Sequence, residues 1–356
     1  IKKSERSKPE DLGYFYLNLA VSYNNLSDKI NEKKYLIKSL EILKDQYGDN
    51  STDAAYLYSE LGFYYFMASD YKKAEDNLNK ALKIQNRFKD DTTNEDLINT
   101  YQYLSNLYQR LSNFRESEKY ILKAIDLNKK LFGIKNVNNI QLMDQYADIQ
   151  IDKDNYLKAI GIYKNNLEVL EELDIKGFDY SNVLNALGLA YWEFGDYKKA
   201  KEYLNATLIN DRKLIKNPDV EYATTLHNLA LVYDDEGAFQ KAEELYLEAL
   251  EITIKDVGEN HYETVVTLSE LAGFYNKYGF SKKADKYIKK AINVSEKLFK
   301  DKNLQNSTNY AFLSEIYIQK GDYINADKYA KKALKIQQKS LPKDHYDFGN
   351  TYGLLA

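Results

Sequence analysis

The chain has 356 residues, with 50 Lys plus Arg against 54 Asp plus Glu and a net charge of −4. This balance disfavours sequence-independent binding to nucleic acid or to an anionic membrane, because both require a basic surface. No run of about 18 apolar residues occurs, so no membrane-spanning helix is predicted and a cytoplasmic location is expected. The chain has no cysteine, which excludes disulfides, thiolate nucleophiles and cysteine-ligated zinc.

A leucine or tyrosine followed by a small residue recurs along the chain in steps of 41 to 43 residues. Self-similarity at a period of this size indicates one supersecondary unit stacked repeatedly on its neighbours. A tyrosine follows four residues after the first position in seven of the eight complete units. The pairs are Leu19-Ala20, Leu61-Gly62, Leu104-Ser105, Tyr146-Ala147, Leu187-Gly188, Leu229-Ala230, Leu271-Ala272, Leu313-Ser314 and Leu355-Ala356.

The unit spanning residues 183–206 shows what the repeat is. Leu187 and Tyr191 lie on a helical period, Gly195 interrupts that period, and Ala200 and Leu204 share one face of a second helix. Each unit is therefore predicted to be an antiparallel helical hairpin. The small residue of the first helix and the alanine that opens the second are expected where the two helices cross closely, since larger side chains would separate the axes.

This pattern resembles the tetratricopeptide repeat, and its long period resembles the kinesin light chain type of that repeat. Residues 258–272 and 342–356 look like the linker and first helix of that family, although Tyr262 and Tyr346 stand where the family has proline. The resemblance implies an all-α, right-handed superhelical solenoid whose first helices line a concave groove. We expect one array over residues 11–356, with eight hairpins and the start of a ninth, after a lead-in of residues 1–10. The ends suggest a fragment of a longer protein.

At the N-terminal end the groove positions that the resemblance implies are markedly apolar. An exposed apolar surface on a monomer is usually covered by another helix or chain segment. The three expected occupants are a partner helix, a linker folded back and a further N-terminal segment. This apolar groove includes Tyr56, Phe63 and Phe66.

In the middle of the chain the implied groove positions are polar and acidic. Asp144, Asp148 and Asp152 recur every four residues, which places them in one stripe on a helix. The stripe favours either a partner that supplies Lys or Arg or an ordinary solvated face. Trp192, the single tryptophan, is either an aromatic anchor for a peptide or packed against the next unit, and His227 either contacts the groove or is solvated. The predicted peptide-binding residues are Asp144, Asp148, Asp152, Asn182, Asn185, Trp192, His227, Asn228, Asp234 and Asp235.

The remaining histidines give little sign of chemistry. His261 and His345 lie two periods apart at the same repeat position, so they are expected to shape loops rather than to share a site. No glycine-rich phosphate loop, Ser-His-Asp set or His-Glu-x-x-His spacing appears. We expect no catalysis, no metal site and no cofactor.

These features together predict a scaffold that binds a peptide or helical segment, basic or amphipathic, in its groove. The alternative is a sensor or regulatory arm of a multidomain protein, for example one with a caspase-like CHAT protease or a histidine kinase effector, whose own domains could then occupy the groove. A remote alternative is single-stranded nucleic-acid binding by helical repeats. The net charge and the acidic stripe argue against nucleic acid.

Overall fold

The computed structural model describes residues 9–25, 28–88, 94–299, 304–341, 345 and 347–356. The chain divides into two compact units, residues 1–142 and 143–356, which we call unit 1 and unit 2. Each unit is built from helical hairpins, and the described residues contain no strand. The all-α repeat fold expected from the sequence is therefore confirmed.

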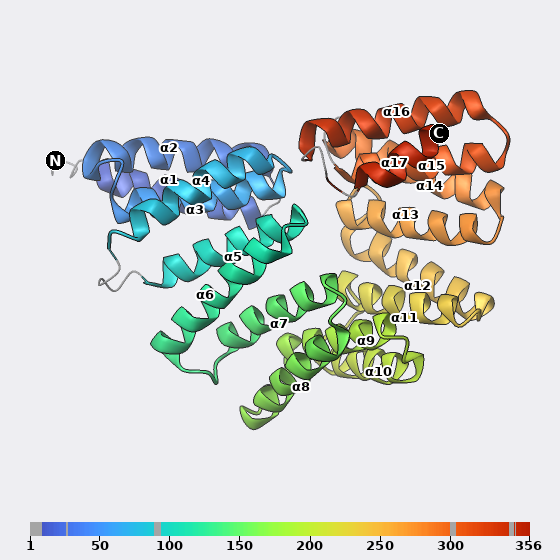
Figure 1. Ribbon diagram of the computed structural model, residues 1–356, viewed down its shortest axis with the longest axis horizontal. Coiled ribbons are helices and arrows are strands. Elements are labelled where there is room, and N and C mark those ends of the chain that lie inside the picture. The colour runs from blue at the N-terminus through green and yellow to red at the C-terminus, as the bar shows by residue number, and fades with distance from the viewer. Residues whose placement is uncertain (1–8, 26–27, 89–93, 300–303, 342–344, 346) are drawn as a thin grey trace, which may run out of the picture. The chain divides into compact units, whose positions relative to one another are not determined.

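The helices follow one another as hairpins in chain order (Figure 1). Unit 1 contains α1 (Pro9–Asn25), α2 (Lys29–Tyr47), α3 (Thr52–Met67), α4 (Tyr71–Gln85), α5 (Asn94–Arg110) and α6 (Phe114–Phe132). The boundary falls within α7 (Val137–Asp152). Unit 2 continues with α8 (Tyr156–Glu172), α9 (Phe178–Glu193), α10 (Tyr197–Leu214), α11 (Val220–Asp235), α12 (Phe239–Val257), α13 (Tyr262–Lys277), α14 (Ser281–Phe299), α15 (Leu304–Gln319), α16 (Tyr323–Ser340) and α17 (Asp347–Leu355).

From the second hairpin onward, the turn inside each hairpin has a left-handed residue eight positions after the repeat leucine or tyrosine. Gly195, at φ 85°, and its equivalents in the later hairpins adopt that conformation without a steric penalty. Ser69, Ser112 and Asp154 occupy the same place in three earlier hairpins, with φ between 57° and 59°. A residue with a Cβ is disfavoured there, so these three turns are held by the surrounding hairpin.

Two of the histidines cap helices, as the sequence predicted for loop-shaping residues. His261 Nδ1 accepts a hydrogen bond from the backbone N–H of Glu263 at 3.3 Å, at the start of α13. His345 Nδ1 accepts from Asp347 N at 3.3 Å, at the start of α17. Each ring satisfies a backbone donor that the first turn of a helix leaves without a partner.

Small residues mark the close crossing inside each hairpin. A Cβ added to Gly188 would lie 2.6 Å from Leu204 Cγ and 3.3 Å from the carbonyl oxygen of Ala200, and one added to Gly62 would lie 2.5 Å from Leu78 Cγ. In one hairpin Ser105 and Ser117 fill the crossing with a buried pair of hydroxyls. The alanines predicted at the crossings are all buried, which confirms the register: Ala74, Ala159, Ala200, Ala242, Ala284 and Ala326.

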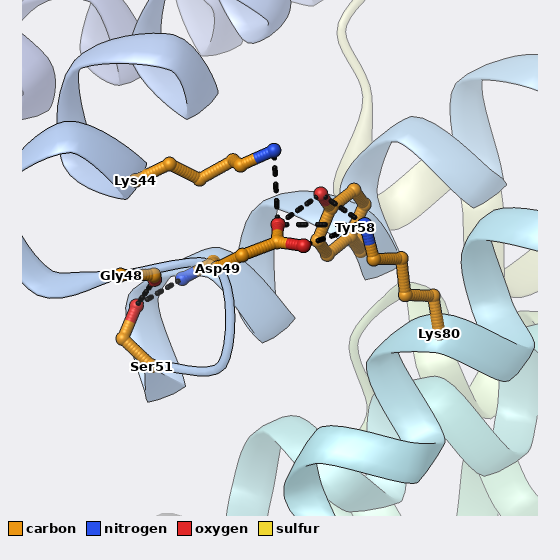
Figure 2. A network of polar contacts seen from close by, with 7 residues as sticks. Lys44, Gly48, Asp49, Ser51, Tyr58 and Lys80 are labelled. Carbon is orange, nitrogen blue, oxygen red and sulfur yellow. Dashed lines mark hydrogen bonds and ion pairs between the residues drawn. The ribbon is translucent and has the colours of Figure 1, made fainter.

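A polar cluster ties the first two hairpins together (Figure 2). The Asp49 carboxylate, in the α2–α3 loop, accepts a hydrogen bond from Tyr58 OH at 2.6 Å and lies 3.0 Å from Lys44 Nζ and 3.1 Å from Lys80 Nζ. Lys80 Nζ also donates to Tyr58 OH at 2.6 Å. The hydrogen bond from Tyr58 is the main cause that lowers the pKa of Asp49, and the two lysines add to it.

A related cluster occurs in unit 2, where the carboxylate comes from α14 rather than from a loop: Tyr310 OH donates to Glu296 at 2.5 Å. Lys332 lies 4.0 Å from Glu296 and 4.7 Å from the centre of the Tyr310 ring. A lysine placed over a tyrosine ring gains cation–π attraction in addition to the ion pair. We call the two clusters junction staples, because each one joins consecutive hairpins.

The helices of each unit form two layers, which differ in how closely their members approach. Odd-numbered helices of neighbouring hairpins contact each other, as α3 does with α5, α9 with α11 and α13 with α15. The strong contacts of even-numbered helices are with odd-numbered ones. Helices on the inside of a curve lie closer together than those on the outside, so within each unit we call the odd-numbered helices the inner layer and the even-numbered helices the outer layer.

No helix in the described part of the chain is long and apolar enough to cross a membrane. Within the same residues, no group of three His, Cys, Asp or Glu side chains is arranged to hold a metal ion.

Candidate peptide-binding surface

Positive charge is concentrated in the outer layer, whereas acidic residues occur in both layers. Every helix of the inner layer carries at least one acidic residue, and the basic residues of that layer are Arg110 and Lys277 alone. Each helix of the outer layer carries at least two basic residues. A chain that is nearly neutral as a whole therefore presents an acidic inner layer.

Two side chains of α8 donate hydrogen bonds to the first two aspartates of the predicted stripe. Asn166 Nδ2 donates to Asp144 Oδ1 at 2.8 Å, and Tyr163 OH donates to Asp148 Oδ1. Tyr163 and Asn166 are each 1% exposed, so both carboxylates are held by buried groups of the same hairpin. Asp152, one turn further on, is exposed.

Loss of hydration dominates the electrostatics of this pair. Burial raises the pKa of Asp144 to about 7, with a further contribution from the charge of Asp148. Burial also raises the pKa of Asp148, although its side chain is accessible to solvent. A carboxylate can be accessible to solvent and still have protein atoms on most sides if it lies on a concave surface, so we infer that Asp148 lies on such a surface.

Trp192 is linked to the next two hairpins by a chain of polar contacts. Its indole Nε1 donates to Asp235 Oδ2 at 2.8 Å. Lys277 Nζ lies 3.2 Å from Asp235 Oδ1 and 3.0 Å from Asp234 Oδ2, and Tyr278 OH donates to Asp234 Oδ1 at 2.7 Å. Trp192 remains partly exposed, so the contact fixes the ring edge and leaves part of the ring accessible.

The amide and imidazole groups among the predicted residues differ in whether they are exposed and free to contact a ligand. Asn228 Nδ2 donates to Asn185 Oδ1 at 3.1 Å, and Asn228 is buried, so these two amides bond to each other across neighbouring hairpins. Asn182 is exposed. His227 packs edge-on against the Tyr246 ring at 5.2 Å, and burial lowers its pKa to about 4, which keeps the imidazole neutral at pH 7.

Three further carboxylates lie on the same layer; the repeat spacing already indicated an inward position for Glu193, whereas Glu270 and Glu315 were missed from sequence. Glu193 and Glu315 are exposed and Glu270 is partly exposed; they lie on α9, α15 and α13, and the surrounding protein atoms raise the pKa of each. None of the three forms a hydrogen bond or an ion pair with another residue of the described chain. Lys277 was missed too, although it stands at the repeat position of Glu193 and Asp235, so an alignment of the later hairpins would have found it.

The predicted apolar groove lies in unit 1, on α3. Tyr56, Phe63 and Phe66 are all partly exposed. The Phe63 ring stacks on Tyr103 of α5 at 4.6 Å and lies 6.3 Å from the Phe66 ring. The aromatic side chains therefore form one surface that spans two neighbouring inner helices.

Comparison with solved structures shows the same fold in peptide-binding and factor-binding proteins. A Rap protein complexed with competence and sporulation factor is 14% identical and has a TM-score of 0.61, with 98% of this chain and 92% of that chain covered. NprR in complex with its cognate peptide NprX is 18% identical with a TM-score of 0.56, and the match covers 99% of this chain and 98% of that one.

Among curated proteins, the sol locus transcriptional repressor of Clostridium acetobutylicum is 30% identical over 167 residues, which is 46% of this chain and 42% of that protein. The chain thus matches less than half the length of this relative. Models described as tetratricopeptide repeat match residues 15–87, 97–138, 140–213, 179–255, 221–297 and 263–339. Because these matches cover most of the chain, the chain belongs to the tetratricopeptide repeat family.

Proposed function

We propose that the inner layer of unit 2 binds a cationic or amphipathic peptide segment. The observation that carries this proposal is the set of solvent-accessible carboxylates on that layer that no cation of the described chain neutralises. Glu193, Glu270 and Glu315 are the clearest members, and the protein atoms around each of them raise its pKa. A carboxylate that is partly surrounded by protein and has no counter-ion is destabilising, and a ligand that supplies the missing positive charge recovers that free energy on binding.

Trp192 and the exposed Asn182 give the proposed surface its other contacts. The Trp192 ring edge is fixed by Asp235, so the accessible part of the ring is already ordered before a ligand arrives. Ordered aromatic anchors contribute strongly to peptide affinity, because little side-chain freedom is lost on binding. The Asn182 amide can both donate to and accept from an extended peptide backbone.

The comparisons support a peptide as the ligand without identifying it. The Rap and NprR structures contain a factor and a cognate peptide, respectively. At 14% and 18% identity these structures support the fold alone. The positive charge proposed for the ligand is inferred only from the acidic residues of this chain.

A regulatory arm is the second candidate, and the partial matches favour it. The transcriptional repressor extends well beyond the matched region, as does a signal transduction ATPase with a tetratricopeptide repeat sensor, of which 54% is covered at a TM-score of 0.52. In such an arrangement a peptide on the inner layer would control a domain outside the array. The acidic inner layer argues against nucleic acid as its ligand.

The test is retention of the full chain on arrays of nonapeptides that are strongly cationic, neutral or strongly anionic and are matched in hydropathy. We expect cationic peptides to be retained and the double variant Glu193→Gln, Glu270→Gln to weaken their binding by about tenfold. The control is Glu202→Gln, Glu251→Gln, which makes the same charge change on the outer-layer helices α10 and α12. Equal retention of cationic and anionic peptides, or an equal effect of the control, contradicts the proposal.

A further inference from the structure

A second and different cluster lies on the inner layer of unit 1. Tyr56, Glu60 and Phe63 are spaced four and three residues apart, so they share one face of α3. The Phe63 ring stacks on Tyr103 of α5 at 4.6 Å with an angle of 21° between the rings. Tyr103 hydrogen-bonds the Glu60 carboxylate, and all four side chains are partly exposed. One carboxylate therefore lies among three aromatic rings on an accessible surface.

The surroundings of Glu60 add negative charge and no positive charge. Asp96 of α5 and Glu32 of α2 are the charged groups that act on it, and both raise its pKa, which burial itself raises to about 7. Glu32 is already paired with Lys29 at 2.9 Å. Of the three inner helices α1, α3 and α5, only α5 has a basic residue: Arg110, whose Nε donates to Tyr71 OH at 3.3 Å.

We propose that the cluster formed by Tyr56, Glu60, Phe63 and Tyr103 binds a lysine or arginine side chain of a protein partner. A cation placed there gains Coulombic attraction from Glu60 and is attracted by the faces of the rings. The stem of the same side chain is apolar and packs against aromatic surface. Ring faces and a carboxylate at one place match the two parts of a long cationic side chain.

Charge also decides between the possible occupants of this surface. A purely apolar helix laid over Tyr56, Phe63 and Phe66 would bury Glu60 completely with no counter-ion, at a cost that the apolar contacts would first have to offset. An anionic segment would meet Glu60, Asp96 and Asp53 with like charge. The occupant that removes this cost is a cation, so the apolar groove expected from sequence is a mixed aromatic and ionic site.

The decisive experiment uses the full chain with Glu193, Glu270 and Glu315 all changed to Gln, so that the proposed site of unit 2 is weakened. The probe is a fluorescein-labelled peptide of alternating lysine and glycine, and its matched control carries acetyl-lysine. In this background we expect Glu60→Gln to reduce binding of the lysine peptide by about tenfold and Phe63→Leu by a smaller factor. Glu41→Gln, the same change at an exposed position of α2 in unit 1, should have no effect.

The outcomes separate the two proposals. If the background substitutions leave binding unchanged and Glu60→Gln removes it, the unit 1 site stands and the unit 2 proposal fails. If Glu60→Gln matches Glu41→Gln, or if acetyl-lysine peptide binds as well as lysine peptide, the unit 1 site is wrong.

Thermal melting gives a second readout that a purely structural role of Glu60 would not produce. A carboxylate whose folded pKa is raised destabilises the fold once it is ionised, so Glu60→Gln should raise the melting temperature at pH 8 while it weakens binding. Gln can still accept the hydrogen bond from Tyr103. A lower melting temperature in Glu60→Gln would show that the carboxylate holds the fold together, which overturns the proposal.

Discussion

The inner layers of unit 1 and unit 2 use the same repeat positions for different chemistry. Two residues after the repeat leucine or tyrosine stands Phe63 in unit 1, but Asp148 and Gly273 in unit 2. One residue before it stand Glu60 and Tyr103 in unit 1, and Asn228 and Glu270 in unit 2. The α3–α5 surface of unit 1 thus places aromatic rings around Glu60, whereas carboxylates and amides of unit 2 stand at these positions without aromatic neighbours of that kind on α7 and α11. The hairpin constrains the leucine, the small residue and the alanine, and it leaves the inner positions free to diversify.

The largest effect should come from what the two units share. Gly188→Leu and Gly62→Leu should each destabilise the protein by about 1–3 kcal/mol, because the new side chain overlaps Leu204 or Leu78 across the helix crossing. Gly161→Leu is the control, since nothing lies within 4 Å of a Cβ added there. Thermal melting followed by circular dichroism measures the change. A melting temperature for Gly188→Leu equal to that of the control would mean that the repeat register is wrong.

The next effect should distinguish the units. Lys277→Gln removes the cation that neutralises Asp234 and Asp235 in unit 2. We expect cationic nonapeptides to bind about tenfold more tightly, mainly through faster association. Lys255→Gln, at an exposed position of α12, is the matched control. Stopped-flow association at low salt measures the rates, and an unchanged rate for Lys277→Gln would argue against a ligand at this place.

The stability of both units should depend on pH, because each unit contains a carboxyl group with a raised pKa. Glu60 and Asp144 each have a pKa of about 7 in the folded state, against ordinary pKa values of 4.5 and 3.8. The folded protein therefore binds more protons between those limits, so each group lowers stability as pH rises from about 4 to about 7. Glu60→Gln and Asp144→Asn should each flatten part of that decline in urea titrations.

Binding should change with pH in the opposite direction from stability. Affinity for cationic peptides should rise from about pH 6 to about pH 8, as both carboxylates ionise. An affinity that is constant over this range would show that neither carboxylate contacts the ligand.

The smallest effect should come from the junction staples. Tyr58→Phe and Tyr310→Phe each remove one hydrogen bond to a carboxylate, at an expected loss of about 1 kcal/mol. Because the pKa of Asp49 is lowered, the stability that this carboxylate contributes is present at neutral pH and is lost as pH falls below the ordinary aspartate pKa of 3.8. Tyr108→Phe, which removes a hydrogen bond to Glu75 outside the staples, is a comparison for size. Melting temperatures at pH 7 and pH 3 test the expectation.

The sequence predicted the fold well because the fold depends on local spacing. The distance from Leu187 to Gly188, Tyr191 and Ala200 specifies a hairpin and its crossing, and each contact falls within one repeat. The turns were harder to predict. Glycine marks them from Gly195 onward, but Ser69, Ser112 and Asp154 adopt the same left-handed conformation, and of these only aspartate is a residue type that favours it.

The candidate site was less predictable because its contacts cross between helices. The four-residue spacing of Asp144 and Asp148 placed both on one face, but their hydrogen bonds to Asn166 and Tyr163 depend on how α8 packs. The bond from Trp192 to Asp235 joins residues 43 apart, on neighbouring hairpins. Loss of hydration at Glu60 or Glu270 depends on all surrounding atoms, which no residue pattern records.

Lys277 would compete with the cationic ligand proposed for unit 2. Its ammonium group lies beside both Asp234 and Asp235, where a lysine of a bound peptide would also be attracted. On the proposed function, a ligand would have to displace that group or share its carboxylates, so competition with Lys277 would raise the ligand concentration needed for binding. Exchanging this one residue between lysine, glutamine and glutamate would then adjust the sensitivity of the array stepwise while the hairpins themselves stay unchanged.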